Sequence, residues 1–328
     1  MSAALDDRPI FVLGRPHSGN TMMAMVLGRH SQIHGSIGES LLFEHLPALA
    51  ALAPTERARA VTDHLRRAAQ PTLDAATVAG VRSVLERIAT ETPEVSIADL
   101  MSHGMRHLAK AAGKSYWAQK ATSYIFYVDD IFRVFPRARL VFLARNPFDI
   151  GASHKRRGTG IASVRSVLAW NRGLRRATAA AAAHPDQFKI VHYEQLVTDG
   201  ATLLPPLMRF LDLEPEPDQL DVPHVNRSEE KYALRSEDQG LNSSRVYYFR
   251  KELTPAEVGL LYHYIDKPVL RQVYPHLAEE LATVPTPHIG LRTVGLVKGF
   301  GLFAAQSMKA FGKSPRSAAD RIAKRLQA

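Results

Sequence analysis

Residues 9–22 read PIFVLGRPHSGNTM, and this stretch predicts a strand, a tight turn and the start of a helix. The apolar run Ile10–Leu13 is the strand, Gly14–Gly19 forms the turn, and the helix begins at Asn20. The turn matches the phosphate-binding pattern G-x-x-x-x-G-K-[ST] at every fixed position except the lysine, because Asn20 stands there. The stretch therefore predicts the anion-binding junction of an α/β sheet.

Backbone amides at such a helix N-terminus bind a phosphate or sulfate group without help from a lysine. Three side chains that favour anions crowd the same turn: Arg15, Ser18 and Thr21. Their density favours an anion site over the alternative, ordinary packing of a glycine-bearing turn between helix and sheet. The lysine that holds the far phosphates of ATP or GTP is missing, so a nucleoside triphosphate is not the expected ligand.

The composition limits the classes of protein that the chain can form. With 328 residues it is long enough for one large α/β domain with a sizeable core. It has no Cys, which excludes disulfides, thiolate metal sites and a cysteine nucleophile. The first residues lack the pattern of a signal peptide, and no apolar stretch reaches about 18 residues, so we expect a cytoplasmic protein without a spanning helix.

The net charge of +10 is concentrated near the C-terminus. Residues 285–328 hold eight Lys or Arg and one Asp, a balance of +7, which leaves +3 for residues 1–284, so we expect no nucleic-acid partner. The apolar residues of this stretch fall on helical spacing between basic ones: Leu291, Val294, Val297, Phe300, Ala304, Met308 and Phe311. Such a basic amphipathic extension packs on the body or a second copy, lies on a membrane, or is disordered, and these alternatives stay open.

Short apolar runs alternate with helical segments along the rest of the chain. The predicted strands are Ile10–Leu13, Ile33–Ile37, Tyr116–Gln119, Arg139–Ala144 and Phe188–His192. The main helical segments between them are 54–70, 74–90, 97–112 and 163–183. This alternation predicts an α/β fold with an open parallel sheet flanked by helices, in which ligands bind at the carboxyl ends of the strands.

We predict one α/β domain over residues 1–284 and a separate basic extension at 285–328. A helical insertion at about 45–112 is interpreted as a cap over the site. Pro205-Pro206 is expected to interrupt the chain, and a helix resumes after Thr254, where Thr-Pro-Ala-Glu is a capping-box start. No spacing of His, Asp or Glu suggests a metal site.

A second anion-binding segment is residues 139–157, RLVFLARNPFDIGASHKRR. A strand ends at Ala144, Arg145 follows at its mouth, and Ser153 lies on the helix that starts near Phe148. The forked guanidinium of Arg145 and the hydroxyl of Ser153 both suit one phosphate group. The alternative is an arginine that pairs with surface carboxylates, and this segment alone does not decide between the two.

Together these segments resemble the nucleotide-sulfate-dependent sulfotransferases. PHSGNT at 16–21 is similar to the family's P-R-S-G-T-T or P-K-S-G-T-T loop, and RNPFDIGAS at 145–153 matches R-[DN]-P-x-D-[VI]-x-x-S. Three more segments follow the family's order: WAQKATSY at 117–124, VHYEQLV at 191–197 and YYFRKELTPAE at 247–257. The resemblance spans about 250 residues and implies a P-loop-like sheet that binds 3′-phosphoadenosine 5′-phosphosulfate (PAPS), which leaves 3′-phosphoadenosine 5′-phosphate (PAP). That donor has no γ-phosphate, which accounts for the missing lysine.

The resemblance also implies which residues bind the donor. The loop residues Arg15, Ser18, Gly19, Asn20 and Thr21 would hold the 5′-phosphosulfate, and Arg145 with Ser153 the 3′-phosphate. Further residues of the donor site follow later in the chain. Tyr193 would lie near the adenine, and the loop at Ser243, Ser244 and Arg245 would close over the 3′-phosphate, with Arg250 and Lys251 as alternatives for that role.

For the transfer itself, the resemblance implies that Lys120 stabilises the sulfuryl group and that Glu39 in IGES takes the acceptor's proton. Glu44, His34 and His45 remain alternatives to Glu39 as the base. His17 stands where the family has Arg or Lys; it donates to the sulfuryl oxygens when protonated, or it is only a loop residue and Lys120 has that role. Gln119 replaces the family's usual Glu.

The implied reaction is sulfuryl transfer to a hydroxyl of a carbohydrate, lipid or small-molecule acceptor, with no metal. Two other readings remain open from the sequence: a nucleotide-dependent kinase with a degenerate phosphate loop, and a membrane-associated binding protein that acts through the basic extension. The acceptor is not indicated, although the extension favours one near a membrane.

Overall fold

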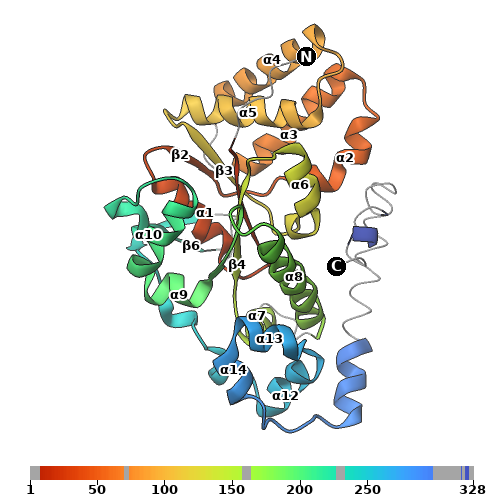
Figure 1. The fold of residues 1–328 in the computed structure, drawn as a ribbon, viewed down its shortest axis with the longest axis vertical. Helices are drawn as coiled ribbons and strands as arrows, with labels where there is room; N and C mark the ends of the chain where they lie inside the picture. Colours follow the sequence, from red (N-terminus) through yellow and green to blue (C-terminus); the bar gives the residue numbers. More distant parts are fainter. Residues whose placement is uncertain are drawn as a thin grey trace.

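The computed structural model describes residues 8–69, 74–156, 164–226, 233–297, 319 and 322–324. Its centre is a five-stranded parallel sheet in the order β2-β3-β1-β4-β5 (Figure 1). The strands are β1 (Ile10–Gly14), β2 (Ile33–Ser36), β3 (Tyr116–Lys120), β4 (Arg139–Ala144) and β5 (Phe188–His192). The α/β fold with an open parallel sheet predicted from the sequence is confirmed, with strand ends within one residue of the predicted ones.

Both faces of the sheet are buried, which is why its strands are apolar runs. In β1 the side chains of Phe11 and Leu13 enter one core, and that of Val12 enters the other. β1 pairs with β4 through Val12 and Val141 and with β3 through Val12 and Lys120. The carboxyl ends of β1, β3 and β4 therefore lie side by side.

Helices cover each face of the sheet. α1 (Asn20–Arg29), α9 (Tyr193–Thr198) and α10 (Gly200–Phe210) bury residues in the core of one face. α6 (Val128–Val134) and α8 (Val164–Ala183) pack on the other face, together with the short helix η1 (Tyr124–Tyr127). α7 (Pro147–His154) follows β4 directly.

The stretch between β2 and β3 is helical, as expected, but it begins at residue 42 rather than 45. It contains α2 (Leu42–Ala50), α3 (Pro54–Ala69), α4 (Ala75–Glu91) and α5 (Ile97–Ala111), of which α3 to α5 gather at one end of the molecule (Figure 1). Asp74 and Ser96 cap α4 and α5 by accepting hydrogen bonds from backbone amides of the first turn. We refer to α2–α5 as the helical insertion.

The C-terminal part adds further elements, the last three of which lie at the opposite end of the molecule from the helical insertion (Figure 1). They are η3 (Pro217–Leu220), a hairpin of β6 (Pro223–Asn226) and β7 (Ala233–Gln239), η4 (Ser243–Arg245), α11 (Phe249–Glu252), α12 (Pro255–Tyr264), α13 (Lys267–Val273) and α14 (Pro275–Glu280). Thr254 and Glu257 form the predicted capping box of α12. The expected interruption at Pro205-Pro206 is wrong: both lie inside α10, where burial of Leu203, Leu204 and Leu207 offsets the lost backbone hydrogen bonds.

Residues 289–297 of the basic extension are helical and pack on the body. A Cβ on Gly295 would lie 2.9 Å from Val164 and 3.2 Å from Leu260. Phe300, Ala304, Met308 and Phe311, which were expected to continue this helix, lie outside the described residues. Within the described part of the chain, no helix combines the length and the apolar character needed to cross a membrane.

Candidate functional site

The loop between β1 and α1 is held in a conformation that few residues adopt. His17 has φ 70° and Gly19 has φ 88°, and the Ser18 amide donates to the Arg15 carbonyl over 3.1 Å. A Cβ at Gly19 would lie 2.7 Å from the ring of Tyr193, so this position needs glycine for its φ and for its neighbour. The first-turn amides of α1 open towards this loop, because a helix start leaves them without partners inside the helix.

Asn20, at the position of the missing lysine, folds under the loop. Its side-chain Nδ2 donates to the Arg15 carbonyl over 3.0 Å, and a Cβ on Gly14 would lie 2.2 Å from its Oδ1. The side chain is buried and braces the loop from below. Asn20 therefore offers an anion its backbone amide and not a side-chain charge.

Ser18 and Thr21 lie buried on the same turn. The hydroxyl of Ser18 has no hydrogen-bond partner among the described residues, which is costly unless a ligand or water supplies one. Thr21 Oγ1 accepts a hydrogen bond from Lys120 Nζ over 3.4 Å. The first turn of α1 thus joins the loop to the end of β3.

Lys120 and Glu39 form an ion pair beside that turn. Lys120 is fully buried at the end of β3, and its Nζ lies 3.4 Å from Glu39 Oε1, just beyond the end of β2. About a third of the Glu39 side chain (31%) is exposed, so its carboxylate faces both the lysine and the outside. Adjacent parallel strands bring these two residues together across 81 positions of sequence.

The three alternatives to Glu39 occupy other surroundings. Glu44 is buried on α2, and His45 makes a 2.9 Å hydrogen bond through Nδ1 to the Leu41 carbonyl. His34 lies within β2, where burial, followed by the charge of Lys114, lowers its pKa. The ion pair with Lys120 therefore distinguishes Glu39 by geometry.

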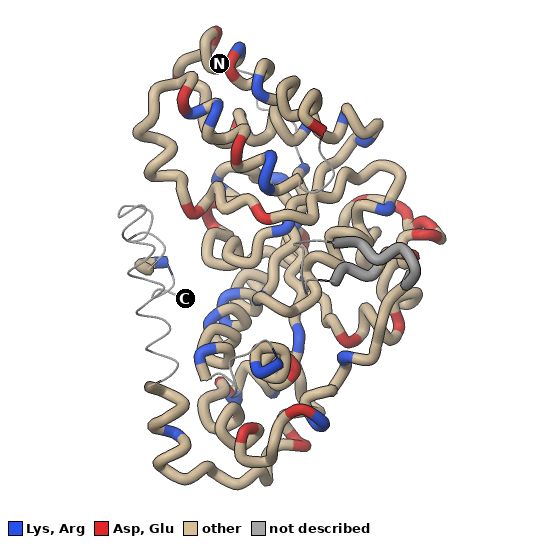
Figure 2. Tube along the Cα trace, turned by 180° about the vertical axis from the view of Figure 1, so that it is seen from behind, with Lys and Arg blue, Asp and Glu red and all other residues tan. Residues whose placement is uncertain are grey.

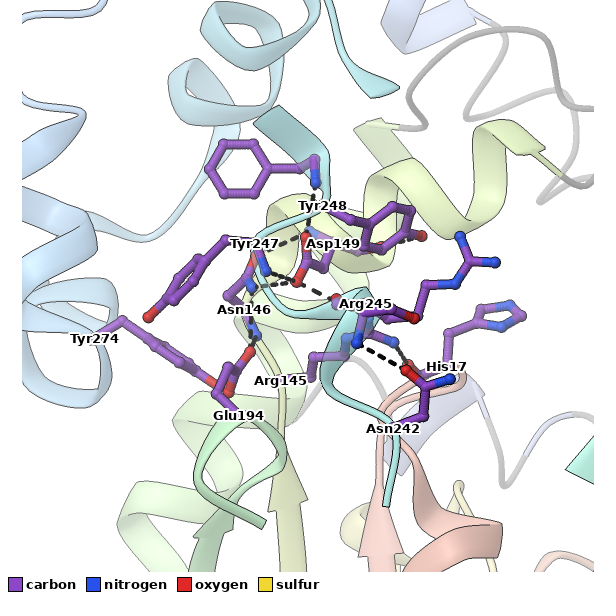
Figure 3. A network of polar contacts seen from close by, with 12 residues as sticks. His17, Arg145, Asn146, Asp149, Glu194, Asn242, Arg245, Tyr247, Tyr248 and Tyr274 are labelled. Carbon is purple, nitrogen blue, oxygen red and sulfur yellow. Dashed lines mark hydrogen bonds and ion pairs between the residues drawn. The ribbon is translucent and has the colours of Figure 1, made fainter. Parts of the chain in front are cut away.

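Arg145 links the loop to a segment a hundred residues further on (Figure 3). Its Nη1 donates to the His17 carbonyl over 2.9 Å and its Nη2 to the Arg245 carbonyl over 2.7 Å. The guanidinium lies 4.2 Å from the centre of the Tyr193 ring, and its buried Nε has no partner among the described residues. Because Arg145 makes these contacts, the alternative interpretation, an arginine that pairs with surface carboxylates, does not hold.

A buried polar network behind Arg145 was not predicted from the sequence (Figure 3). The Asp149 carboxylate accepts hydrogen bonds from the amides of Tyr247 and Phe249, each over 2.9 Å, and from Asn146 Nδ2 over 2.7 Å. Burial raises the pKa of Asp149, while the Phe249 amide, Arg145 and the Asn146 side chain oppose the change. Asp149 thereby fastens residues 247–249 to the start of α7.

Glu194 completes this network from the other side. Its Oε1 accepts from the backbone amide of Asn146 over 2.9 Å, and its Oε2 accepts from the Tyr274 hydroxyl over 3.1 Å. Asn146 and Asp149 lie between Arg145 and Ser153 in one quoted motif, and Glu194 follows Tyr193 in another. Their position in those motifs could have identified them as residues of the site.

Ser153 and His17 meet neighbours at the rim of the same site. Ser153 is hydrogen-bonded to the hydroxyl of Tyr248, whose pKa is raised chiefly by burial. The ring of His17 packs edge-on against His154, with 4.5 Å between their centres. Both contacts join α7 to segments that lie far from it in sequence.

The remaining predicted donor-binding cations lie apart from one another. The Arg15 guanidinium lies 5.5 Å from the ring of Phe126, and a Cβ on Gly173 would lie 2.5 Å from its Cδ. Arg245 lies 5.3 Å from the ring of Tyr248, close to Arg145.

The other two cations of that prediction lie on α11. Arg250 pairs with Glu280 at 2.7 Å and is half exposed, and Lys251 is exposed. It is therefore the backbone carbonyl of Arg245, and not a group of Arg250, that accepts the hydrogen bond from Arg145. Among the described residues, no group of three or more His, Asp or Glu is arranged to hold a metal ion.

The chain is similar to several known proteins. An uncharacterized protein of Aquifex aeolicus (strain VF5) is 25% identical over 271 residues, which is 76% of this chain but 31% of that protein. The sulfotransferase domain of the Synechococcus PCC 7002 olefin synthase has a similar fold, with a TM-score of 0.57, 19% identity and coverage of 85% of this chain and 98% of that one. A sulfotransferase domain from the curacin biosynthetic pathway gives a TM-score of 0.48 at 17% identity, covering 90% and 97% of the two chains. Residues 9–218 match the model of the sulfotransferase family, and the chain belongs to that family.

Proposed function

We propose that this sulfotransferase uses PAPS as its donor and transfers the sulfuryl group to a hydroxyl of a carbohydrate, lipid or small-molecule acceptor. The observation that carries the proposal is the grouping of Glu39, Lys120 and Thr21 beside a phosphate loop whose lysine position holds Asn20. A donor that ends in a single sulfuryl group needs no lysine at that position.

The residues of the site fit such a donor. The Ser18 hydroxyl and the Arg145 Nε are buried donors without partners among the described residues, and no side chain of the N-cap residue Gly19 caps the first-turn amides of α1, which suit an anion. We assign the loop amides with Ser18 and Thr21 to the 5′-phosphosulfate, and Arg145 with Ser153 and Arg245 to the 3′-phosphate. Tyr193 has Gly19 and Arg145 against its ring, so it connects the residues assigned to the two groups.

Glu39 is the base in this proposal. When bound, the donor supplies a sulfuryl group that the acceptor oxygen attacks in line, so that an O–S bond forms as the bond to PAP breaks. Glu39 accepts the proton that the acceptor hydroxyl loses, and Lys120 stabilises charge on the transferring oxygens. The Glu39–Lys120 ion pair aims the carboxylate at the end of β3 before the substrates arrive.

Calorimetry with PAP and with ATP and Mg²⁺ tests the choice of donor. We expect PAP to bind at least about tenfold more tightly, because no described side chain of the loop takes the place of the γ-phosphate lysine. Tighter binding of ATP would favour a kinase, and failure of both to bind would overturn the proposal. A screen for transfer of labelled sulfate from PAPS across sugar, lipid and small-molecule acceptors then identifies the acceptor class.

A further inference from the structure

The segment that carries Glu39 is neither helix nor strand. Residues 37–41 connect β2 to α2, and the ion pair with Lys120 holds only the end of the Glu39 side chain. Acidic and basic residues are interspersed over the described body (Figure 2), so no one-sided field of charge fixes where the carboxylate lies. Contacts of the residues on either side of Glu39 must therefore set its position.

The residue before Glu39 is fastened to the end of α3. The Gly38 amide donates to the Ala68 carbonyl over 2.7 Å, and the last carbonyls of a helix need such a partner from outside it. A Cβ on Gly38 would lie 2.1 Å from the Arg67 carbonyl oxygen and 2.6 Å from that of Ala68, so only glycine permits this approach. The end of α3 thus fixes the backbone on one side of Glu39.

The residues after Glu39 are fastened by the hydroxyl of Tyr124, at the start of η1. Its oxygen accepts a hydrogen bond from the Leu42 amide over 3.1 Å, and the same amide donates to Ser40 Oγ over 3.3 Å. Ser40 is also hydrogen-bonded to the Tyr124 hydroxyl. The N-cap of α2 is Leu41, whose side chain cannot accept a hydrogen bond, so the tyrosine oxygen serves the first turn of α2 instead.

Packing fixes the position of this hydroxyl. Tyr124 is fully buried, and its ring centre lies 4.9 Å from that of Phe43 and 6.0 Å from that of Phe11 in β1. Tyr124 and Lys120 belong to one short stretch, WAQKATSY at 117–124. That stretch therefore supplies both the cation that faces the Glu39 carboxylate and the hydroxyl that holds the residues after it.

We propose that Tyr124 is a positioning residue for sulfuryl transfer: its hydroxyl holds residues 40–42 so that Glu39 stays within reach of the acceptor hydroxyl. The inference rests on the proposed function, in which Glu39 is the base. Tyr124 is not assigned to the donor or to the reacting atoms, so its effect on the rate must pass through Glu39.

Turnover of Y124F, alone and combined with E39Q, tests this proposal. Phenylalanine keeps the ring and removes the hydroxyl, so kcat should fall about tenfold or more through misplacement of the base, while the Kd of PAP and the KM of PAPS should change by less than about twofold. In the E39Q background the same change should lower the residual kcat by less than about twofold, since no base is left to position. Equal losses in the two backgrounds would overturn the proposal, as would a kcat of Y124F equal to that of the wild type.

Y116F is the matched control, because Tyr116 lies at the amino end of β3 and its hydroxyl accepts a hydrogen bond from Arg8 Nη2 over 3.2 Å. Its kcat should stay within about twofold of the wild-type value. S40A removes one partner of the Tyr124 hydroxyl and should lower kcat several-fold, again only while Glu39 is present. Circular dichroism shows whether each variant is folded, and S40A takes the place of Y124F in the test if Y124F is not.

Hydrogen exchange separates this inference from the proposed function. The amides of residues 38–44 should exchange several-fold faster in Y124F than in the wild type and in Y116F, whether or not a transfer activity is found. Unchanged exchange in Y124F would overturn the inference even if kcat falls. If instead the wild type neither binds PAP nor transfers sulfate, it is the proposed function that fails, whatever the exchange of Y124F.

Discussion

Single residues of the site act through their neighbours on adjacent strands. Lys120 is enclosed by the sheet and by Thr21, and the carboxylate of Glu39 is its charged partner. A buried lysine is stable only with such a partner, so Glu39 supports the fold of the site before it takes part in any reaction. Its partial exposure leaves one side of the carboxylate available to an acceptor.

Replacing Glu39 by Gln should abolish most turnover and leave donor binding nearly intact. The amide keeps the size of the side chain but accepts no proton, and a general base contributes about 100-fold or more to the rate. Sulfate transfer to the acceptor found by the screen, together with PAP calorimetry, measures the two effects. E44Q is the control at a buried carboxylate of α2; if it loses turnover while E39Q retains it, Glu44 is the base.

The loop glycine gives a second prediction at this scale. G19A should destabilise the protein by at least about 2 kcal/mol, because alanine at φ 88° is strained and its Cβ would meet the Tyr193 ring at 2.7 Å. G113A is the control, since Gly113 has φ 68° but nothing within 4 Å of an added Cβ, and about 1 kcal/mol is expected there. Urea unfolding measures both, and equal losses would mean that the Tyr193 contact is unimportant.

At the scale of elements, buried polar contacts set how segments join. Asp149 fastens residues 247–249 to α7, and Arg145 fastens η4 to the phosphate loop. In the helical insertion, α2 and α3 meet at a pair of histidines: His64 is buried, its ring centre is 5.2 Å from that of His45, and its Nδ1 has no partner among the described residues.

The buried His64 predicts acid sensitivity of the insertion. Burial, then the charges of Arg67 and His45, lower the pKa of His64 to about 3 from 6.5. Because the unfolded chain binds a proton below pH 6.5 and the folded chain does not, this residue should reduce the free energy of unfolding by about 2 kcal/mol between pH 7 and pH 5. Urea unfolding at the two pH values measures the loss.

Removal of the histidine tests its part in that loss. In H64L the pH-dependent loss should shrink by most of that amount, whereas the same replacement at the exposed His276 controls for the loss of one histidine. An unchanged pH dependence in H64L would assign the acid sensitivity to other groups.

Over the whole molecule, the elements that form the sheet were predictable because they obey local rules. Strands buried on both faces must be apolar, and residues just beyond their carboxyl ends must lie at one edge, so Glu39, Lys120 and Arg145 could be placed from their positions alone. Contacts between distant segments have no such rule. The Asp149 contacts to residues 247–249, the Arg250–Glu280 pair and the course of α10 through two prolines each depend on burial that the sequence pattern does not record.

Donor binding should stabilise the entire fold. At a PAP concentration of about 100 times its Kd, the free energy of unfolding should rise by about 2.7 kcal/mol, seen as a higher Tm. R145A should lose about 2 kcal/mol of PAP binding, so the same concentration should stabilise it by less than about 1 kcal/mol. R250A, whose side chain pairs with Glu280, is the matched control and should respond like the wild type; a loss in R250A without a loss in R145A would place the 3′-phosphate near α11.

The strand order has a consequence for how this protein could change its chemistry. Because β1 lies between β3 and β4, the phosphate loop lies between two sides of the site. One side holds Glu39, Lys120 and the helical insertion. The other side holds Arg145, α7 and residues 245–249. Under the proposed function, the side with the helical insertion binds the acceptor and the side with Arg145 binds the nucleotide. Exchange of α2–α5 between relatives would then alter which molecule is sulfated while the recognition of PAPS is inherited unchanged.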